Sequence, residues 1–127
     1  MLRDRNSSAI VAVSDLARAR AFYEDILGLM IEASSVEDGF LSFRTGQTSL
    51  GVYASQFAGT NKANAVTWEM KGDIVDVTHD LKSKGVVFEH YPDMPGTLNG
   101  DIHENGDMKM VWFKDPDGNI LHLVQGM

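Results

Sequence analysis

The sequence predicts an α+β fold built from two copies of one strand–helix–strand–strand–strand (βαβββ) unit. Short runs of alternating or β-branched apolar residues indicate strands, two stretches show helical spacing instead, and this order of patterns occurs twice along the chain. Each helix follows the first strand of its copy, so both helices are expected on the outer face of a curved mixed sheet. The other face is then free to form a cup.

In the first copy, a helix is expected from Asp15 to Gly28. Ser14 or Asp15 can accept a hydrogen bond from the free N–H groups of its first turn, and Gly28 supplies the stop. Its apolar residues recur at helical spacing, at Leu16, Ala19, Phe22, Tyr23, Ile26 and Leu27. Strands are expected at 8–13, 30–35, 40–44 and 49–53.

The second copy follows a polar linker and repeats the order. A helix is expected from Asp73 to Gly85, with strands at 65–70, 86–89, 109–114 and 119–125. Residues 91–107 are rich in proline and glycine, which predicts an irregular excursion with one short ladder. A single domain is therefore expected over residues 1–127, with a first module at about 7–54, a linker at 55–63 and a second module at about 64–127.

Composition excludes several classes of function. The 127 residues are 43% hydrophobic, enough for a compact core, and no apolar run has membrane-spanning length. The chain has no cysteine and its N-terminus lacks a signal-peptide pattern, so a cytoplasmic location fits best. A net charge of −7 argues against nucleic acid and anionic membranes as partners. It favours a cationic or metal-borne ligand, although solubility alone also explains an acidic surface.

The stretch from Trp112 to Gln125 reads as two strands joined by a tight turn at Asp115–Asn119. Simple antiparallel pairing sets Phe113 opposite Ile120, Trp112 opposite Leu121, Val111 opposite His122 and Lys109 opposite Val124. His122 then shares a face with Lys109, and we expect this neighbouring cation to lower the pKa of His122. His122 is either a half-buried histidine satisfied by a neighbour, or a group that bonds an anionic or carbonyl group of a ligand or acts as acid or base.

Strand alternation assigns further side chains to the cup. The cup-facing sets are Ser8, Ile10 and Ala12, then Ser49, Gly51 and Tyr53, then Ala65, Thr67 and Glu69. Tyr53 and Phe113 are expected to form an apolar wall, with Tyr91 near the rim. Trp68, Trp112 and Phe22 are expected in the core on the helical side.

These features together resemble the vicinal oxygen chelate superfamily. The resemblance is carried by the βαβββ repeat, by Val13–Ala19 with Phe22–Leu29, and by the closing Asp115–Asn119. That superfamily holds glyoxalase I, extradiol dioxygenases, fosfomycin-resistance enzymes and bleomycin-resistance proteins. The resemblance covers nearly the whole chain, and its motifs are specific for fold but poor indicators of function, since they cap helices and turn strands.

The resemblance implies a cup formed by two paired modules, commonly in a homodimer, that holds a divalent metal in the enzymes. Its ligands would come from the first strand and a late strand of each module, which here fall at Ser8, Ser49, Ala65 and His122. Three strong donors are missing from that set, so we expect no cofactor and no metal at the usual site. A rearranged divalent-metal site around His122, Glu69 and His103 is the alternative.

Three functions follow from this resemblance. The first is a metal-independent homodimer that binds a small organic ligand in the cup. The second is a metal-dependent lyase, isomerase or dioxygenase with a rearranged site, and the third is a non-catalytic regulatory or interaction module. His122 is the candidate catalytic residue. The candidate ligand-binding residues are Ser8, Ser49, Tyr53, Ala65, Thr67, Glu69, His103, Lys109, Phe113 and His122.

Overall fold

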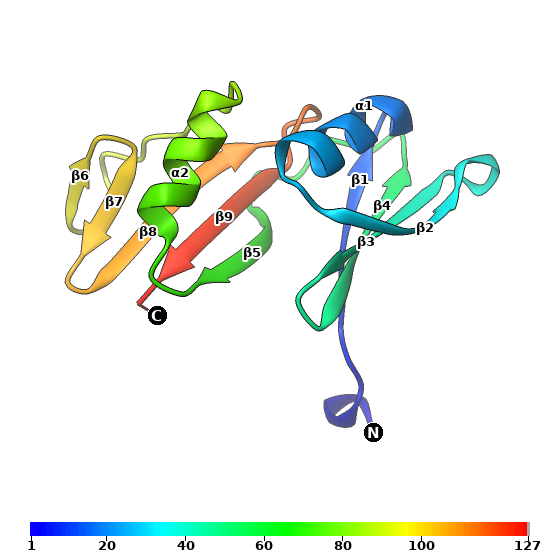
Figure 1. Ribbon diagram of the computed structural model, residues 1–127, viewed down its shortest axis with the longest axis horizontal. Coiled ribbons are helices and arrows are strands. Elements are labelled where there is room, and N and C mark those ends of the chain that lie inside the picture. Colours follow the sequence, from blue (N-terminus) through cyan, green and yellow to red (C-terminus); the bar gives the residue numbers. More distant parts are fainter. Residues whose placement is uncertain (127) are drawn as a thin grey trace. The chain divides into compact units, whose positions relative to one another are not determined.

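The computed structural model describes residues 1–126, with the side chains of Ser35 and Val36 left outside the description. The module end expected at Met127 therefore lies outside the described residues. The chain divides into two compact units, Met1–Lys62 with Pro116–Asn119, and Ala63–Asp115 with the chain from Ile120. Each unit pairs a mixed sheet with a helix (Figure 1), which confirms the predicted α+β class. Within residues 1–126, no helix has the length and apolarity needed to cross a bilayer.

The sheet of the first unit has the strand order β1-β4-β3-β2, with β1 and β4 parallel and the other neighbours antiparallel. The strands are β1 (Ala9–Val13), β2 (Met30–Ser35), β3 (Phe40–Thr45) and β4 (Thr48–Ala54). Helix α1 (Leu16–Arg20) continues as a π-helical segment, η2 (Ala21–Ile26). Two 3-10 turns, η1 (Leu2–Asp4) and η3 (Val36–Asp38), complete the unit. The predicted strands and helix of the first copy are therefore confirmed to within one or two residues.

The core of the first unit lies between its sheet and the helical segment. Asp15 starts α1 by accepting a 3.0 Å hydrogen bond from the backbone N–H of Arg18, and Gly28 follows the helical segment with a φ of +72°. The segment delivers the buried Tyr23, whose ring centroid lies 5.9 Å from that of Phe43 on β3. The buried strand residues on this side are Val11, Val13, Leu41, Leu50 and Val52. The alternate residues form the open face of the first sheet, as strand alternation predicts.

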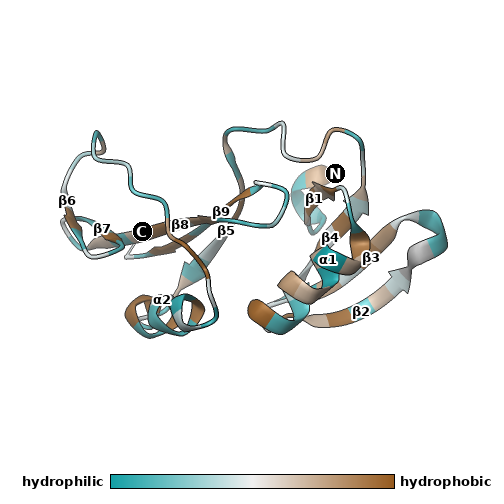
Figure 2. Ribbon diagram, turned by 90° about the horizontal axis from the view of Figure 1, so that it is seen from above, coloured by the Kyte–Doolittle hydropathy of each residue, from teal (hydrophilic) through white to brown (hydrophobic). Residues whose placement is uncertain are grey.

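The sheet of the second unit has the order β5-β9-β8-β7-β6, and helix α2 (Ile74–Ser83) lies along one of its faces (Figure 2). The strands are β5 (Asn64–Met70), β6 (Thr97–Asn99), β7 (Ile102–Asn105), β8 (Met108–Lys114) and β9 (Ile120–Gln125). The first turn of α2 is fixed to the sheet because the Ile74 N–H donates to Gln125 Oε1 at 3.0 Å. The buried residues on this side are Ile74, Leu81, Val111, Phe113, Leu121 and Leu123.

The prediction of a strand at 86–89 is wrong, because these residues do not form a continuous strand. Only one bridge forms there, between Phe88 and Phe113, and the Glu89 N–H donates to the Trp112 carbonyl at 2.8 Å. The chain then leaves β8 through a segment with two prolines, which cannot donate to a ladder, and returns as the β6–β7 hairpin beside the other end of β8. The predicted short ladder of the excursion is thus confirmed.

The closing hairpin differs from the prediction by one residue in register. Trp112 lies opposite His122 and Phe113 opposite Leu121. A one-residue shift moves each side chain to the other face of the sheet. The assignment of Phe113 to the ligand wall is therefore wrong, since Phe113 is 1% exposed and packs against Phe88 on the helical side, 5.7 Å between ring centroids. Trp112, expected in that core, shares the open face with His122.

The same shift displaces Lys109. Lys109 lies opposite Gln125 instead of Val124, and its ammonium lies 4.0 Å from Glu104 Oε1 on β7. It shares a face with Val111 and Phe113, so the expected pairing of Lys109 beside His122 is wrong.

The turn at Pro116–Asn119 is held by side-chain hydrogen bonds within the first unit. Asp117 Oδ1 accepts from the Ser14 N–H at 3.1 Å, the Ser14 hydroxyl at 2.6 Å and an Arg18 guanidinium N–H at 3.2 Å. Asn119 donates to the Ala12 carbonyl at 2.8 Å. These bonds hold the turn in one conformation, in which Asp115–Asn119 separate the paired ends of β8 and β9.

Replacing Asp117 should destabilise the protein. Asp117→Ala removes three hydrogen bonds, of which the guanidinium bond is charge-assisted, and we expect the free energy of unfolding to fall by about 2 kcal/mol. Asp117→Asn keeps an acceptor for Ser14 and should lose less. Urea unfolding measures the stability of both variants, and Asp25→Ala, at an exposed residue of η2, is the control. An Asp117→Ala midpoint equal to that of the control would contradict the anchoring role.

Candidate functional site

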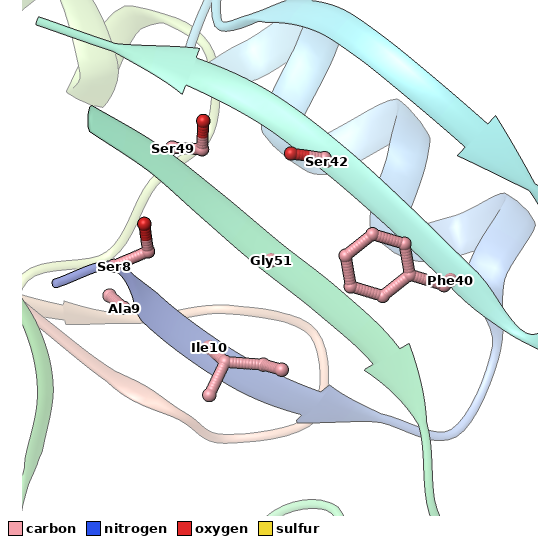
Figure 3. Close-up of a pocket in the computed structure, with 7 residues that line it drawn as sticks. All are labelled: Ser8, Ala9, Ile10, Phe40, Ser42, Ser49 and Gly51. Atoms are coloured by element: carbon pink, nitrogen blue, oxygen red, sulfur yellow. The ribbon is translucent and has the colours of Figure 1, made fainter. Parts of the chain in front are cut away.

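The open face of the first sheet carries a cavity of about 290 Å³ (Figure 3). Its walls combine apolar side chains with three serine hydroxyls. The lining residues are Ser8, Ala9, Ile10, Phe40, Ser42, Ser49 and Gly51. They come from β1, β3, β4 and the residue preceding β1, so neighbouring strands of one sheet position the whole site.

Gly51 forms the floor of the cavity. It lies opposite Ile10 on β1 and Ser42 on β3, in the middle of β4. A Cβ atom at this position would lie 3.3 Å from Cγ1 of Ile10 and 3.3 Å from the Phe40 ring. The missing side chain therefore lets the two apolar groups approach each other over bare backbone, which is a usual reason for glycine inside a strand.

Glu32 lies beside the cavity because β2 contains a bulge. The register of β2 against β3 shifts between Ile31 and Ala33, so Glu32 is the extra residue. Its Oε1 accepts hydrogen bonds from the hydroxyls of Ser42, at 2.9 Å, and Ser49. Its Oε2 lies 3.4 Å from the Arg44 guanidinium. The Ser49 and then the Ser42 hydrogen bonds, with a smaller contribution from Arg44, lower the pKa of Glu32 below its ordinary value despite partial desolvation.

The open face of the second sheet is organised around Trp112. The His122 ring stacks on the indole with 4.5 Å between centroids and 9° between planes. Tyr91 and His103 meet the indole edge-on at 5.3 and 5.1 Å. The indole N–H donates to Asn64 Oδ1 at 3.1 Å. Tyr91, from the irregular excursion, thus packs over a face that the sequence analysis left open.

His122 is 8% exposed and is held neutral by its surroundings. Its Nδ1 lies 3.2 Å from the Thr67 hydroxyl, and its Nε2 is buried without a hydrogen-bond partner among the described residues. Burial lowers the pKa of His122, because a charged imidazole would lose its hydration there. The expected direction of the shift is confirmed, whereas the expected cause, a neighbouring Lys109, is wrong.

His103 is buried on the same face and is also biased toward the neutral form. Its Nε2 accepts a 2.9 Å hydrogen bond from the Tyr91 N–H. Burial lowers the pKa of His103, the His90 charge adds to this effect, and a backbone hydrogen bond with Met110 opposes it. Both histidines therefore contribute packing and hydrogen-bond acceptors at neutral pH.

The remaining predicted residues have different positions. Tyr53 lies on the open face of the first sheet, opposite Phe40, is 38% exposed and is not among the residues that line the cavity. Ala65 lies at the bulge of β5, and Glu69 is exposed opposite Val124.

Sequence reasoning missed Phe40, Ser42 and Glu32. Phe40 and Ser42 alternate with the core residues of β3 and could have been found by strand parity. Glu32 could not, because no sequence signal marks the bulge in β2.

The donors present do not form an ordinary divalent-metal site. Across residues 1–126, no group of three or more His, Asp or Glu side chains could hold a metal ion. In the first unit, the family positions carry the hydroxyls of Ser8 and Ser49, which are weak ligands, and the Ser49 hydroxyl already binds Glu32. In the second unit, His122 Nε2 has no hydrogen-bond partner among the described residues, but no two further His, Asp or Glu side chains described there complete a site with it.

Comparison with known proteins identifies the family. The model of the Glyoxalase/Bleomycin resistance protein/Dioxygenase superfamily matches residues 7–123. The chain belongs to this superfamily. The resemblance seen in the sequence is thereby confirmed. No curated protein sequence gives a significant match.

Several solved protein structures share the fold of the chain. Lactoylglutathione lyase from Agrobacterium tumefaciens is 17% identical with a TM-score of 0.73, over 96% of this chain and 93% of that one. The genomically encoded fosfomycin resistance protein FosX from Listeria monocytogenes is 17% identical with a TM-score of 0.73, over 97% and 93%. An integron cassette protein from the mobile metagenome of Halifax Harbour sewage outfall is 20% identical with a TM-score of 0.71, over 93% and 95%. At these identities the likeness concerns the fold alone.

The buried histidines predict how stability depends on pH. His122 and His103 have folded-state pKa values below 6.5, so the unfolded chain binds more protons. Their contribution to stability is complete above the unfolded pKa and is lost as the pH falls through the folded pKa. We expect the urea midpoint to fall between pH 7.5 and 5, and to fall less in His122→Gln.

His79→Gln, at an exposed residue of α2, is the matched control and should keep the wild-type dependence on pH. A His122 pKa above 6.5 in an NMR titration, or an unchanged dependence in His122→Gln, would refute this prediction.

Proposed function

We propose that this superfamily member binds a small organic molecule in the cavity of the first unit, through side-chain and backbone contacts in place of the usual divalent metal. The observation that carries the proposal is the cavity of about 290 Å³, which combines an apolar wall with several hydroxyl groups. Ligand pockets are mostly apolar concavities with a few placed polar groups, and this site has that composition.

The cavity volume favours a ligand with one ring. A protein cavity of about 150 Å³ is large enough for benzene, so 290 Å³ accommodates a substituted ring. Phe40 and Ile10 supply its apolar contacts, on either side of the bare backbone of Gly51. The three serine hydroxyls then orient the polar end of the ligand.

The donor set favours binding without the usual metal. FosX from Listeria monocytogenes has been solved with Mn(II) and sulfate. Here Ser8 and Ser49 offer neutral hydroxyls, and the rearranged set of His122, Glu69 and His103 has little support, because these described side chains do not form a group of three that could hold a metal ion. Carboxylates and free imidazoles are the donors that a borderline divalent ion needs.

The remaining expectations stay predictions. They are a homodimer, expected because edge strands such as β1 and β2 invite pairing, and a cytoplasmic location. Light scattering at micromolar concentration tests the dimer, and a monomeric mass would contradict it.

Filling the floor of the cavity should weaken ligand binding. In wild-type protein, benzyl alcohol should shift the amide resonances of Ile10, Phe40 and Gly51 with a Kd of about 1 mM, as expected for a ligand of this size. Gly51→Val places a branched side chain between Ile10 and Phe40, and its affinity should fall at least about tenfold.

Ala17→Val is the control, since it introduces valine at an exposed position of α1, an element that does not line the cavity. The proposed site would be refuted if benzyl alcohol shifted no amide resonances of the wild-type protein, or shifted only resonances outside the first unit.

A further inference from the structure

We infer that the cavity of the first unit selects ligands that carry a cationic or hydrogen-bond-donating group, and that Glu32 is the residue that sets this preference. The inference rests on the proposed function, because it concerns the ligand of the same cavity. It adds a residue from β2 that strand parity does not find and that does not itself line the cavity.

The first step concerns the position of Glu32. As the bulge residue of β2, it extends across β3 to reach Ser49 on β4. It therefore lies along the open face, on the side where Ser42 and Ser49 border the cavity. A regular strand would have no extra residue at this point, so the bulge gives the open face a carboxylate.

The second step concerns the direction of the hydroxyl protons. A serine hydroxyl has one proton to donate and two lone pairs that accept. Ser42 and Ser49 both donate that proton to Oε1 of Glu32. Their lone pairs are then what they offer to a ligand. Two of the three hydroxyls in the cavity thus act as acceptors, whereas the third, Ser8, can take either role.

The third step concerns charge. The Arg44 guanidinium lies 3.4 Å from Oε2, but its side chain is 57% exposed, and exposed ion pairs are weak and screened by salt. The two serine bonds, led by Ser49, keep Glu32 ionised below its ordinary pKa. A carboxylate ligand in the cavity would therefore face hydroxyl lone pairs and a nearby negative charge.

The apolar wall supports the same class of ligand. The face of an aromatic ring attracts a cation, and Phe40 provides such a ring beside the serines. The net charge of −7 acts in the same direction over longer distances. The chemical class that fits is a one-ring molecule with an amine or a similar donor, and not one with a carboxylate.

Three one-ring probes of similar size test the inference: benzylamine, benzyl alcohol and benzoate, titrated at pH 7 into isotope-labelled protein. Benzylamine is protonated at this pH and should bind at least about tenfold more tightly than benzoate, as charge-assisted hydrogen bonds allow. Benzyl alcohol should fall between them. In Glu32→Gln, which keeps an acceptor for the serines but removes the charge, the preference should fall to about twofold or less.

Glu24→Gln is the matched control, because it removes one negative charge from the same unit at a residue that pairs with Arg20. It should keep the wild-type preference. Benzoate binding as tightly as benzylamine to wild type, or an unchanged preference in Glu32→Gln, would overturn the role of Glu32 while the proposed function stands. If none of the three probes binds, the proposed function itself fails.

Discussion

The register of the β8–β9 hairpin determines which side chains share the open face of the second sheet, and the turn that joins these strands determines the register. Asp117 and Asn119 are held by Ser14, Arg18 and the Ala12 carbonyl, which anchor the turn. With Asp115–Asn119 between the paired ends, Trp112 comes opposite His122. A turn one residue longer would turn Phe113 outward and Trp112 inward, because side chains alternate along a strand. The stacking on His122 and the burial that lowers its pKa both depend on this register.

The two open faces have different chemistry although their units share a plan. On the second sheet, Trp112, Met110 and Val124 are buried, and Tyr91 and Met94 from the excursion pack against them. That face is therefore a second small core, and its histidines are neutral members of it. On the first sheet, small residues along the middle of β4 leave a cavity. The contrast lies in the surroundings of the candidate residues, because His122 is buried against the Trp112 indole whereas three serines and a glycine line a cavity.

The sequence predicts the architecture well because the relevant signals are local. Helical spacing, Asp15 as a cap, Gly28 as a stop and strand alternation each depend on a few neighbouring residues, and the structure confirms them. The errors concern quantities that local patterns do not encode. The five-residue turn is held by partners about a hundred residues away in the sequence, such as Ser14. With this turn, Trp112 and Phe113 lie on the sheet faces opposite to those predicted. The strand expected at 86–89 has suitable residues, but the chain that follows it leaves the sheet. The bulge at Glu32 has no sequence signature, so its carboxylate could not be placed in advance.

The candidate site of the first sheet depends on two residues, Gly51, which has no side chain, and Glu32, which is the extra residue of β2. Gly51 removes a side chain where Ile10 and Phe40 face each other, which creates volume without disturbing the ladder between β1, β4 and β3. Glu32 adds a residue to β2, which brings a charge over the sheet without lengthening a loop. Each change is local, and neither adds a side chain to the core on the helical side. Ser42 and Ser49 line the cavity and also donate their hydroxyl protons to the Glu32 carboxylate. The carboxylate therefore determines that these two hydroxyls offer lone pairs to a ligand. Gly51 therefore contributes to the shape of the cavity, whereas Glu32 sets the polarity of two of its hydroxyls.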